Sequence, residues 1–428
     1  MNLNKIISRI IVLKKSSLAR HTLWILFARG VRILIQAAYF IIIARNLGVE
    51  QYGAFVSVTA LVNILVPFAS WGSEQILVKN VSRQRSLFAE YWGNALLTIL
   101  VSGSILLIFV LLSFSSFLSS NISFLVVLFV ALSDLLFALV LKTASQAFQS
   151  VQKFNITAQI EILLGVNRLL AALCLLIFFP NQGIVVWASL YMSATVVAAS
   201  IAFLLVQSHL GKPKLALNRI KSELLQGFYF SVSISSITIN NDIDKTMLAR
   251  LSTLEATGIY AAAYRLIDVS VVPISSLVFA SYPSFFKQGA KGIRSSVHFA
   301  QKLLPMGIAY SLTMGIAILL FAPIVPYVLG EDYATAVEAL RWLALLPFLK
   351  CLYALAGNTL TGADLQGLRS AMQATAALLN ILINLWLIPL YSWKGAAWSS
   401  LASDTLLVVG FWSIITWHYW HQSEGEKT

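Results

Sequence analysis

The sequence predicts an all-α integral membrane protein with twelve transmembrane helices, arranged as two six-helix lobes around a central cavity. Three observations lead to this prediction. Apolar runs of roughly 20 residues, the length that spans a bilayer, recur along the chain. Basic residues collect in alternate connections, and a segment of the first half returns in the second. The 428 residues are 58% hydrophobic and only 11% charged, which is too few charges for a soluble surface, where about 25% is usual.

The apolar runs define the spans. We place them at about 22–44, 53–71, 93–115, 124–141, 157–179, 184–207, 227–248, 257–279, 303–328, 336–357, 370–390 and 395–420. Only residues 391–394 separate the last two spans, so these helices are expected to form a tight hairpin.

The distribution of Lys and Arg gives the orientation. If the amino terminus is cytoplasmic, the cytoplasmic segments hold twenty basic residues and the opposite side holds only three, Arg45, Arg250 and Lys394. Because basic residues are retained on the cytoplasmic side, we expect both termini there. The net charge of +13 then reflects topology and contact with anionic headgroups. The basic residues are scattered through short loops, which argues against nucleic-acid binding.

The remaining segments connect or flank the lobes. Residues 1–20 are expected to be a cytoplasmic or interfacial segment, 21–207 the N-lobe, 227–420 the C-lobe and 421–428 a cytoplasmic tail. In residues 208–226 basic side chains alternate with leucine and isoleucine at helical spacing. This pattern predicts an amphipathic linker on the inner leaflet, with a solvated linker as the alternative.

An internal repeat relates the two lobes. Residues 44–55 align with residues 249–260, sharing an Ala-Arg pair, a Glu and a Gly at an offset of 205. Two further matches follow at offsets of 206 and 211: Val66-Pro67 with Val272-Pro273, and Phe88-Ala89 with Phe299-Ala300. Six spans separate equivalent points, so both halves enter the membrane in the same orientation. We therefore expect a pseudo-two-fold axis along the membrane normal, and a site on the seam between the halves.

Many ionisable side chains fall inside the spans, where each costs about 2.5–3.5 kcal/mol unless it faces a partner or a watery cavity. They are Arg29, Arg32, Asp134, Glu161, Arg168, Asp242, Asp244, Lys245, Arg265, Asp268, Arg341, Lys350 and Asp404. So many charges cannot all face acyl chains, and some are expected to line a polar interior.

The spacing of these charges suggests roles. Three pairs share a helix face and could simply neutralise each other: Asp242 with Lys245, Arg265 with Asp268, and Glu161 with Arg168. Arg29 and Arg32 lie three apart in a span without an acid, and two such cations would suit a phosphate. Tyr260 and Tyr264 lie four apart in span 8 and could stack on sugar rings, although packing or an aromatic belt explains them better.

Enzymatic signatures are not found in the sequence. The five histidines show no metal-ligand spacing, and neither a GxxxxGK[ST] phosphate loop nor a GxSxG elbow occurs. We therefore expect no metal and no cofactor, with transport driven by an H⁺ or Na⁺ gradient or by the cargo gradient alone.

Four segments resemble one family. Leu47-Gly48 with Tyr52-Gly53 follows the first span, and Asp244-Lys245 followed by Gly258 to Leu266 forms the span 7–8 junction. Leu329 to Ala336 precedes span 10, and Asn380, Asn384 and Pro389 lead to Gly395-Ala396-Ala397. In this order they are similar to the bacterial polysaccharide flippases, the Wzx-type oligosaccharide flippases of the multidrug/oligosaccharidyl-lipid/polysaccharide exporter superfamily.

The resemblance implies two six-helix bundles around a central cavity in the bacterial plasma membrane. It also implies that the cargo is undecaprenyl-pyrophosphate-linked oligosaccharide, such as an O-antigen or exopolysaccharide repeat unit, which moves from the inner to the outer leaflet. A polysaccharide polymerase and a chain-length regulator would be partners, together with membrane lipids. On this basis Arg29, Arg32, Lys245 and Arg265 are candidate phosphate contacts, Tyr260 and Tyr264 candidate sugar contacts, and Asp242, Asp244, Asp268 and Glu161 candidates for ion coupling.

Two other functions stay open. A drug or metabolite antiporter would keep the fold and change the cargo. A membrane glycosyltransferase or polymerase would need large outer loops with catalytic residues, and the expected outer loops are too short.

Overall fold

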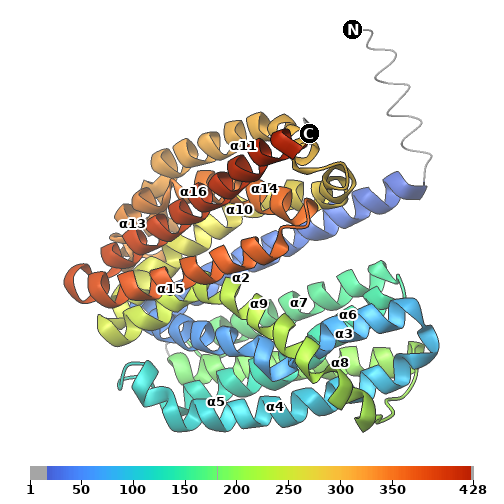
Figure 1. Ribbon diagram of the computed structural model, residues 1–428. Helices are drawn as coiled ribbons and strands as arrows, with labels where there is room; N and C mark the ends of the chain where they lie inside the picture. The colour runs from blue at the N-terminus through green and yellow to red at the C-terminus, as the bar shows by residue number, and fades with distance from the viewer. Residues whose placement is uncertain (1–16, 181, 426–428) are drawn as a thin grey trace, which may run out of the picture.

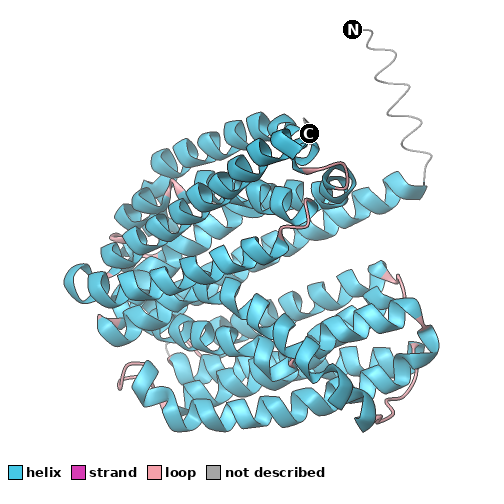
Figure 2. Ribbon diagram, in the orientation of Figure 1, coloured by secondary structure: helices cyan, strands magenta, loops and turns pink. Residues whose placement is uncertain are grey.

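The computed structural model describes residues 17–180 and 182–425, with side chains described from Ile33 onward apart from a few positions. All regular structure in these residues is helical (Figure 2), which confirms the expected all-α class. Arg29 and Arg32 lie in the first helix, but their side chains are outside the described part of the chain. The expected N-terminal segment 1–20 also lies almost wholly outside it.

The described part of the first half forms seven α-helices and two short turns. They are α2 Ser17–Ser70, α3 Ser73–Arg83, the 3₁₀ turn η1 Arg85–Leu87, α4 Phe88–Phe117, α5 Phe124–Leu132, the π-helical turn η2 Ser133–Phe137, α6 Ala138–Ser150, α7 Phe154–Phe178, and α8 Ile184–His209. α2 is not one straight helix, because Gly48 (φ 71°, ψ 173°) is non-helical and breaks it.

The second half begins with α9 and ends with α16. Its elements are α9 Leu217–Leu251, α10 Leu254–Gly289, α11 Ile293–Phe321, η3 Ala322–Ile324, α12 Val325–Leu329, η4 Glu331–Tyr333, α13 Ala336–Leu343, α14 Leu346–Gly362, α15 Gln366–Tyr391 and α16 Trp393–Gly425. α13 and α14 meet at a 42° bend, where Pro347 occupies the first turn of α14 and removes a backbone donor.

Within the described residues, nine helices are long and apolar enough to cross a bilayer, or ten if the bent pair α13–α14 is one span. The chain is therefore a multi-pass membrane protein, as the sequence predicts. Nine or ten candidate spans do not test the expected number of twelve, which stays a prediction.

The helices form two groups in space (Figure 1). The N-terminal group consists of α3 to α8, the C-terminal group consists of α10 to α16, and α2 and α9 lie between them and contact both. The groups diverge toward one end, where α2 begins and α16 ends, and converge at the end that carries the α15–α16 turn.

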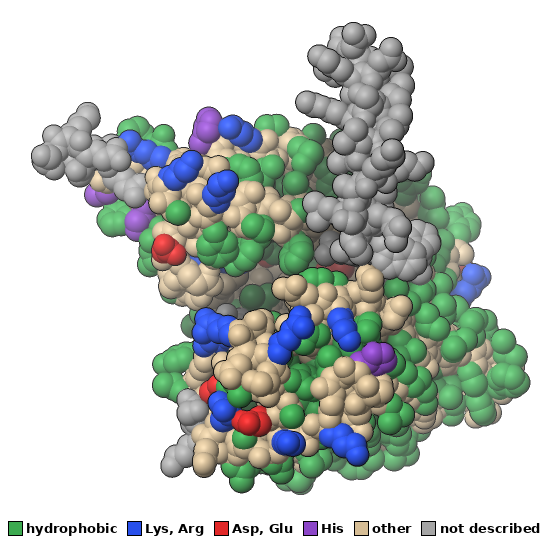
Figure 3. Space-filling view, turned by 90° about the vertical axis from the view of Figure 1, so that its right-hand side faces the viewer, with side chains coloured by type: hydrophobic (Ala, Val, Ile, Leu, Met, Phe, Trp, Pro, Cys, Tyr) green, Lys and Arg blue, Asp and Glu red, His purple; other side chains and the backbone are tan. Residues whose placement is uncertain are grey.

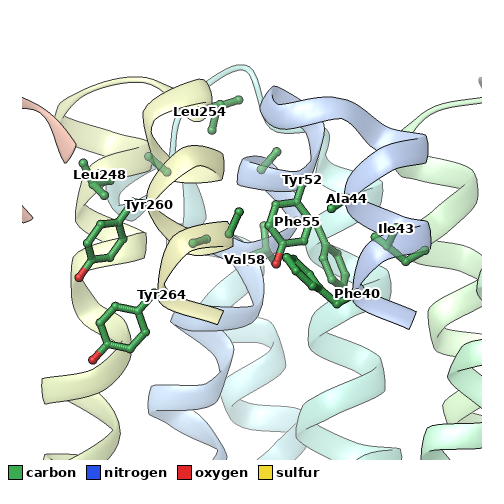
Figure 4. Close-up of a cluster of buried hydrophobic side chains, with 14 of the residues drawn as sticks. Phe40, Ile43, Ala44, Tyr52, Phe55, Val58, Leu248, Leu254, Tyr260 and Tyr264 are labelled. Carbon is green, nitrogen blue, oxygen red and sulfur yellow. The ribbon is translucent and has the colours of Figure 1, made fainter. Parts of the chain in front are cut away.

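The two ends differ in charge and openness. We call the diverging end the basic end, because Lys and Arg side chains outnumber Asp and Glu on it in Figure 3, which also shows a recess between the two halves. At the converging end, apolar side chains of α2 and α10 form the main core (Figure 4), including Phe40, Tyr52, Phe55 and Leu254. The Tyr333 hydroxyl of η4 donates to the Ala44 carbonyl at 3.0 Å and ties the C-terminal group to α2 there.

The segment 208–226, expected to be an amphipathic linker, does not form one continuous helix. Residues 211–216 are not helical, and residues from Leu217 onward are the first turns of α9. Gly211 (φ 117°) and Pro213 interrupt the helix. From Leu217 to Leu251 the helix contains no proline and is continuous. The linker is also tied to α4, since Asn94 exchanges two hydrogen bonds with the backbone of Ala216 (2.9 and 3.0 Å).

Candidate functional site

A cavity of about 530 Å³ lies between the two helix groups. Its wall is built from α2, η2, α6, α7 and α8 on one side and from α9 and α10 on the other. Its charged lining comprises four acids and four bases: Asp134, Lys142, Glu161, Arg168, Asp242, Lys245, Arg265 and Asp268. Five of the candidates that the sequence suggested are among them.

On the N-terminal side, Arg168 of α7 is held by two partners. Its guanidinium lies 3.2 Å from Asp134 Oδ1 and 4.1 Å from the centre of the Tyr191 ring. The Tyr191 hydroxyl donates to both Asp134 oxygens at 3.0 Å. Asp134 belongs to the π-helical turn η2, a local widening that often marks functional positions. The ion pair of Arg168 is thus with another helix, whereas the sequence suggested Glu161 of its own helix.

Lys142 and Glu74 form a second cavity-side pair that sequence reasoning missed. Lys142 Nζ lies 2.6 Å from Glu74 Oε1, and Glu74 is buried while Lys142 is half exposed. The sequence placed Lys142 in a loop, because the apolar run ends at residue 141. α6 continues to Ser150, so this lysine stands on a helix face that lines the cavity.

On the C-terminal side, the expected pair of Asp242 and Lys245 in α9 is confirmed at 2.9 Å. Lys245 also lies 3.7 Å from Asp244 Oδ1 and donates to the Asn241 carbonyl. Asp242 and Lys245 line the cavity. Two carboxylates and a carbonyl therefore satisfy this ammonium in the present conformation.

Asp244, Tyr260 and Tyr264 lie behind the cavity wall. Asp244 is fully buried and accepts hydrogen bonds from the Tyr260 hydroxyl and from Ser400. Tyr264 is buried too, and its hydroxyl accepts from Lys350 at 3.2 Å. Figure 4 shows both tyrosines on the face of α10 that is turned away from Phe40 and Tyr52 of α2. None of the three lines the cavity. The sugar contacts suggested for Tyr260 and Tyr264 and the ion-coupling role suggested for Asp244 stay predictions.

Arg265 and Asp268 of α10 both line the cavity, and among the described residues neither has a hydrogen bond or ion pair. Arg265 is partly buried and Asp268 is exposed. The expected pairing between them within 4 Å is not found in this part of the chain. Arg265 therefore presents to the cavity a guanidinium without a described ion pair within 4 Å, in contrast to Arg168 and Lys245.

Arg265 also lines a second hollow of different character. This groove, of about 360 Å³, runs between α2 on one side and α10, α11 and α12 on the other. Gln36, Phe40 and Arg265 belong to both hollows. Apart from Gln36 and Arg265, the groove is lined only by apolar residues, among them Val269 and Ala317. A polar cavity and an apolar groove thus meet at one arginine.

Comparison with known proteins agrees with this geometry. A sequence model of the family described as "Polysaccharide biosynthesis protein" matches residues 18–288. A protein described as "Putative O-antigen transporter" from Escherichia coli (strain K12) is 23% identical over 408 residues, covering 92% of this chain and 95% of the relative.

Two solved structures share the fold. One is the inward-facing conformation of a multidrug resistance MATE family transporter of the MOP superfamily, with a TM-score of 0.75, 16% identity, and coverage of 93% of this chain and 96% of that one. The other is the lipid II flippase MurJ in an inward closed conformation, with a TM-score of 0.75, 10% identity, and coverage of 91% and 87%. At these identities the likeness shows the fold alone.

Proposed function

The chain belongs to the polysaccharide biosynthesis protein family, and on that basis we propose that it flips undecaprenyl-pyrophosphate-linked oligosaccharide from the inner to the outer leaflet of the bacterial plasma membrane. It acts as a transporter and not as an enzyme, by alternating access of the cavity between the helix groups. A polysaccharide polymerase and a chain-length regulator would receive the cargo on the outer side.

The proposed topology has twelve spans and cytoplasmic termini. Nine apolar helices and the bent pair α13–α14 account for ten. Two more follow if Gly48 divides α2 into two spans and if α9, with 35 residues, also crosses. At 1.5 Å per residue α9 is roughly 50 Å long, which exceeds the thickness of the hydrocarbon layer. α9 is therefore long enough to cross, although it carries charged residues. The basic end is then cytoplasmic, so the cavity faces the leaflet in which the cargo is made.

The observation that carries this proposal is the position of Arg265. A guanidinium without a described ion pair joins a charged cavity to an apolar groove. This arrangement matches an amphiphile with an anionic group between a polar head and a long hydrocarbon chain. Arginine binds phosphate with two parallel hydrogen bonds, so the pyrophosphate lies at Arg265, the sugars in the cavity and the prenyl chain in the groove.

A drug or metabolite antiporter is the second candidate. The four carboxylates of the cavity would suit a cationic solute, and the fold occurs in a multidrug transporter. The pairing pattern favours the flippase, because Asp134 and Asp242 are already neutralised by cations while Arg265 is not.

Reconstitution of the purified protein into vesicles with a fluorescent undecaprenyl-pyrophosphate oligosaccharide tests the proposal. Flipping is expected to exceed that of protein-free vesicles. R265A is expected to slow flipping roughly 10- to 100-fold, because it removes a charge-assisted interaction worth about 1.5–3 kcal/mol. R250A is the matched control, since Arg250 is exposed at the far end of α9. Wild-type vesicles that flip no faster than empty ones would reject the flippase.

A further inference from the structure

A buried lysine and a buried aspartate face each other in the C-terminal group without forming an ion pair. Lys350 of α14 is 7% exposed and Asp404 of α16 is 3% exposed. The two interact electrostatically, yet no described ion pair within 4 Å joins them. Burying two opposite charges is costly unless they meet with good geometry, so this separation calls for an explanation.

The partners of Lys350 are neutral. Its ammonium donates to the Tyr264 hydroxyl at 3.2 Å and to Asn241 Oδ1 at 3.4 Å. Asp404 is incompletely satisfied as well. Its Oδ2 is buried without a hydrogen-bond partner among the described residues. One unpaired carboxylate oxygen thus remains beside one loosely held ammonium.

Lys350 faces a second carboxylate, Asp268 of α10. The two acids differ in access to water, because Asp268 is exposed in the cavity whereas Asp404 is enclosed. Lys350 thus interacts electrostatically with a buried carboxylate and with a cavity carboxylate, and it forms no described ion pair within 4 Å with either.

The charged and titratable groups around Lys350 and Asp404 come from α9, α10 and α14. α9 supplies Asp244, which interacts with Asp404, and α10 supplies Tyr264 and Asp268, while α14 supplies Tyr353. Lys245 is already engaged by Asp242 and Asp244. Of the buried carboxylates here, Asp244 is 3.7 Å from Lys245, so Asp404 is the one that can gain a proton without breaking a described ion pair.

We propose that Asp404 and Lys350 form a proton-binding site, in which Lys350 changes its counter-ion between Asp404 and Asp268. When Asp404 is ionised, Lys350 is held toward α16. When Asp404 takes one proton from water and becomes a neutral carboxylic acid, Asp268 is the remaining anion that faces Lys350, and the lysine is drawn toward α10 and the cavity. Lys350 keeps its own proton throughout. The neighbouring ammonium disfavours a metal cation, so the exchangeable ion is a proton.

The position of Lys350 connects the exchange to movement. It lies in the second turn of α14, directly after the 42° bend between α13 and α14. α14 packs against α10, α11 and α16, so a shift of Lys350 between α16 and α10 changes the packing of the C-terminal group. Tyr264 extends the link to the cavity, because its ring lies 4.3 Å from Lys245 Nζ and 5.2 Å from Lys350 Nζ.

The proton site itself is independent of the cargo, but its use rests on the proposed function. With the basic end cytoplasmic, proton uptake from outside and release inside would drive export of the lipid-linked glycan.

Charge displacement after a pH jump, measured on a solid-supported membrane without cargo, tests the site. Wild type and D404E are expected to give a transient current, and D404N is expected to give none. D364N is the matched control, since Asp364 is an exposed turn residue and the same chemical change there leaves the current intact. In infrared difference spectra the band of a protonated carboxyl gained at low pH is expected to disappear in D404N.

K350M provides a second variant if D404N does not fold. K350M removes the ammonium that favours the ionised form of Asp404, so the current is again expected to be lost. A D404N current equal to wild type would overturn the proposal, and so would a wild-type current that follows Na⁺ at constant pH. If no vesicle flips the glycan, the proposed function fails, while the proton site is still accepted or rejected by the current alone.

Discussion

Gly53 of α2 and Gly258 of α10 lie opposite each other where the two helices cross at the converging end. A Cβ on Gly53 would lie 1.9 Å from the Leu254 carbonyl oxygen, and a Cβ on Gly258 would lie 1.9 Å from the Val49 carbonyl oxygen. These glycines are the same position of the internal repeat, at an offset of 205. The two halves therefore close this end by placing one repeated glycine against the other.

The first prediction is that G258A holds the converging end open. Since the added methyl cannot fit against the Val49 backbone, the helices must separate. A single cysteine at Val56, which lines the cavity, is expected to react with an impermeant maleimide from outside in G258A, at least about tenfold faster than in the parent.

G367A is the control for this experiment, because no atom lies within 4 Å of a Cβ at Gly367. Equal labelling of G258A and the parent would show that the crossing does not seal the cavity.

This glycine pair marks what the sequence could and could not predict. The repeat predicted equivalent positions, because a duplicated backbone requirement leaves the same residue in both copies. It could not predict that the copies touch, because contact depends on how the two halves are placed. The break at Gly48 falls between the expected spans 22–44 and 53–71, whereas the nearly continuous helix on either side of it was not predicted.

The site was predictable to a similar degree. Charge inside apolar spans identified Lys245, Arg265, Asp242, Asp268 and Glu161 as candidates, and all five line the cavity. Spacing along one helix found the Asp242–Lys245 pair but not the Arg168–Asp134 pair, because side chains from different helices meet only after packing. Tyr260 shows the converse limit, since its spacing suited a cavity face and the structure turns it to Asp244.

The second prediction concerns the apolar groove. Trp in place of Ala317, which lines the groove on α11, fills the space assigned to the prenyl chain. A317W is expected to lower flipping of the full-length lipid by roughly tenfold and to affect a short-chain analogue less, because about 0.8 kcal/mol of binding comes from each buried methylene.

L320W is the matched control on the same helix, since Leu320 is 69% exposed and outside the groove. If A317W slows the short and long lipids to the same extent, the groove does not hold the chain.

The third prediction concerns the buried pair on the N-terminal side. D134L removes the counter-ion of Arg168 and the acceptor of the Tyr191 hydroxyl. Leaving one buried charge unpaired costs about 3–5 kcal/mol, so the free energy of unfolding in detergent is expected to fall by that order.

The double variant D134L/R168L separates the pair from the individual side chains. It is expected to recover much of the lost stability, because replacing both charges by apolar groups removes the unpaired ion. A double variant as unstable as the sum of the two single ones would show that the two residues do not interact energetically.

The fourth prediction concerns the linker between the halves. Asn94 of α4 holds the backbone of Ala216 through two hydrogen bonds, and a Cβ on the neighbouring Gly93 would lie 2.2 Å from the Lys214 carbonyl oxygen. The linker therefore lies directly on α4. N94A removes both bonds, worth about 1 kcal/mol each, so the population with a detached linker is expected to rise roughly tenfold or more.

Trypsin cleavage after Lys214 in inside-out vesicles reports this population, because the proposed topology exposes the basic end there. Lys212 precedes Pro213, so it is not a trypsin site. S208A is the control. Ser208 is exposed, and its hydroxyl makes hydrogen bonds only with other residues of α8, so this variant should be cleaved at the parental rate. If N94A is cut no faster than S208A, the linker is held by other contacts, of which the Arg219–Glu90 ion pair at 2.5 Å is the next to remove.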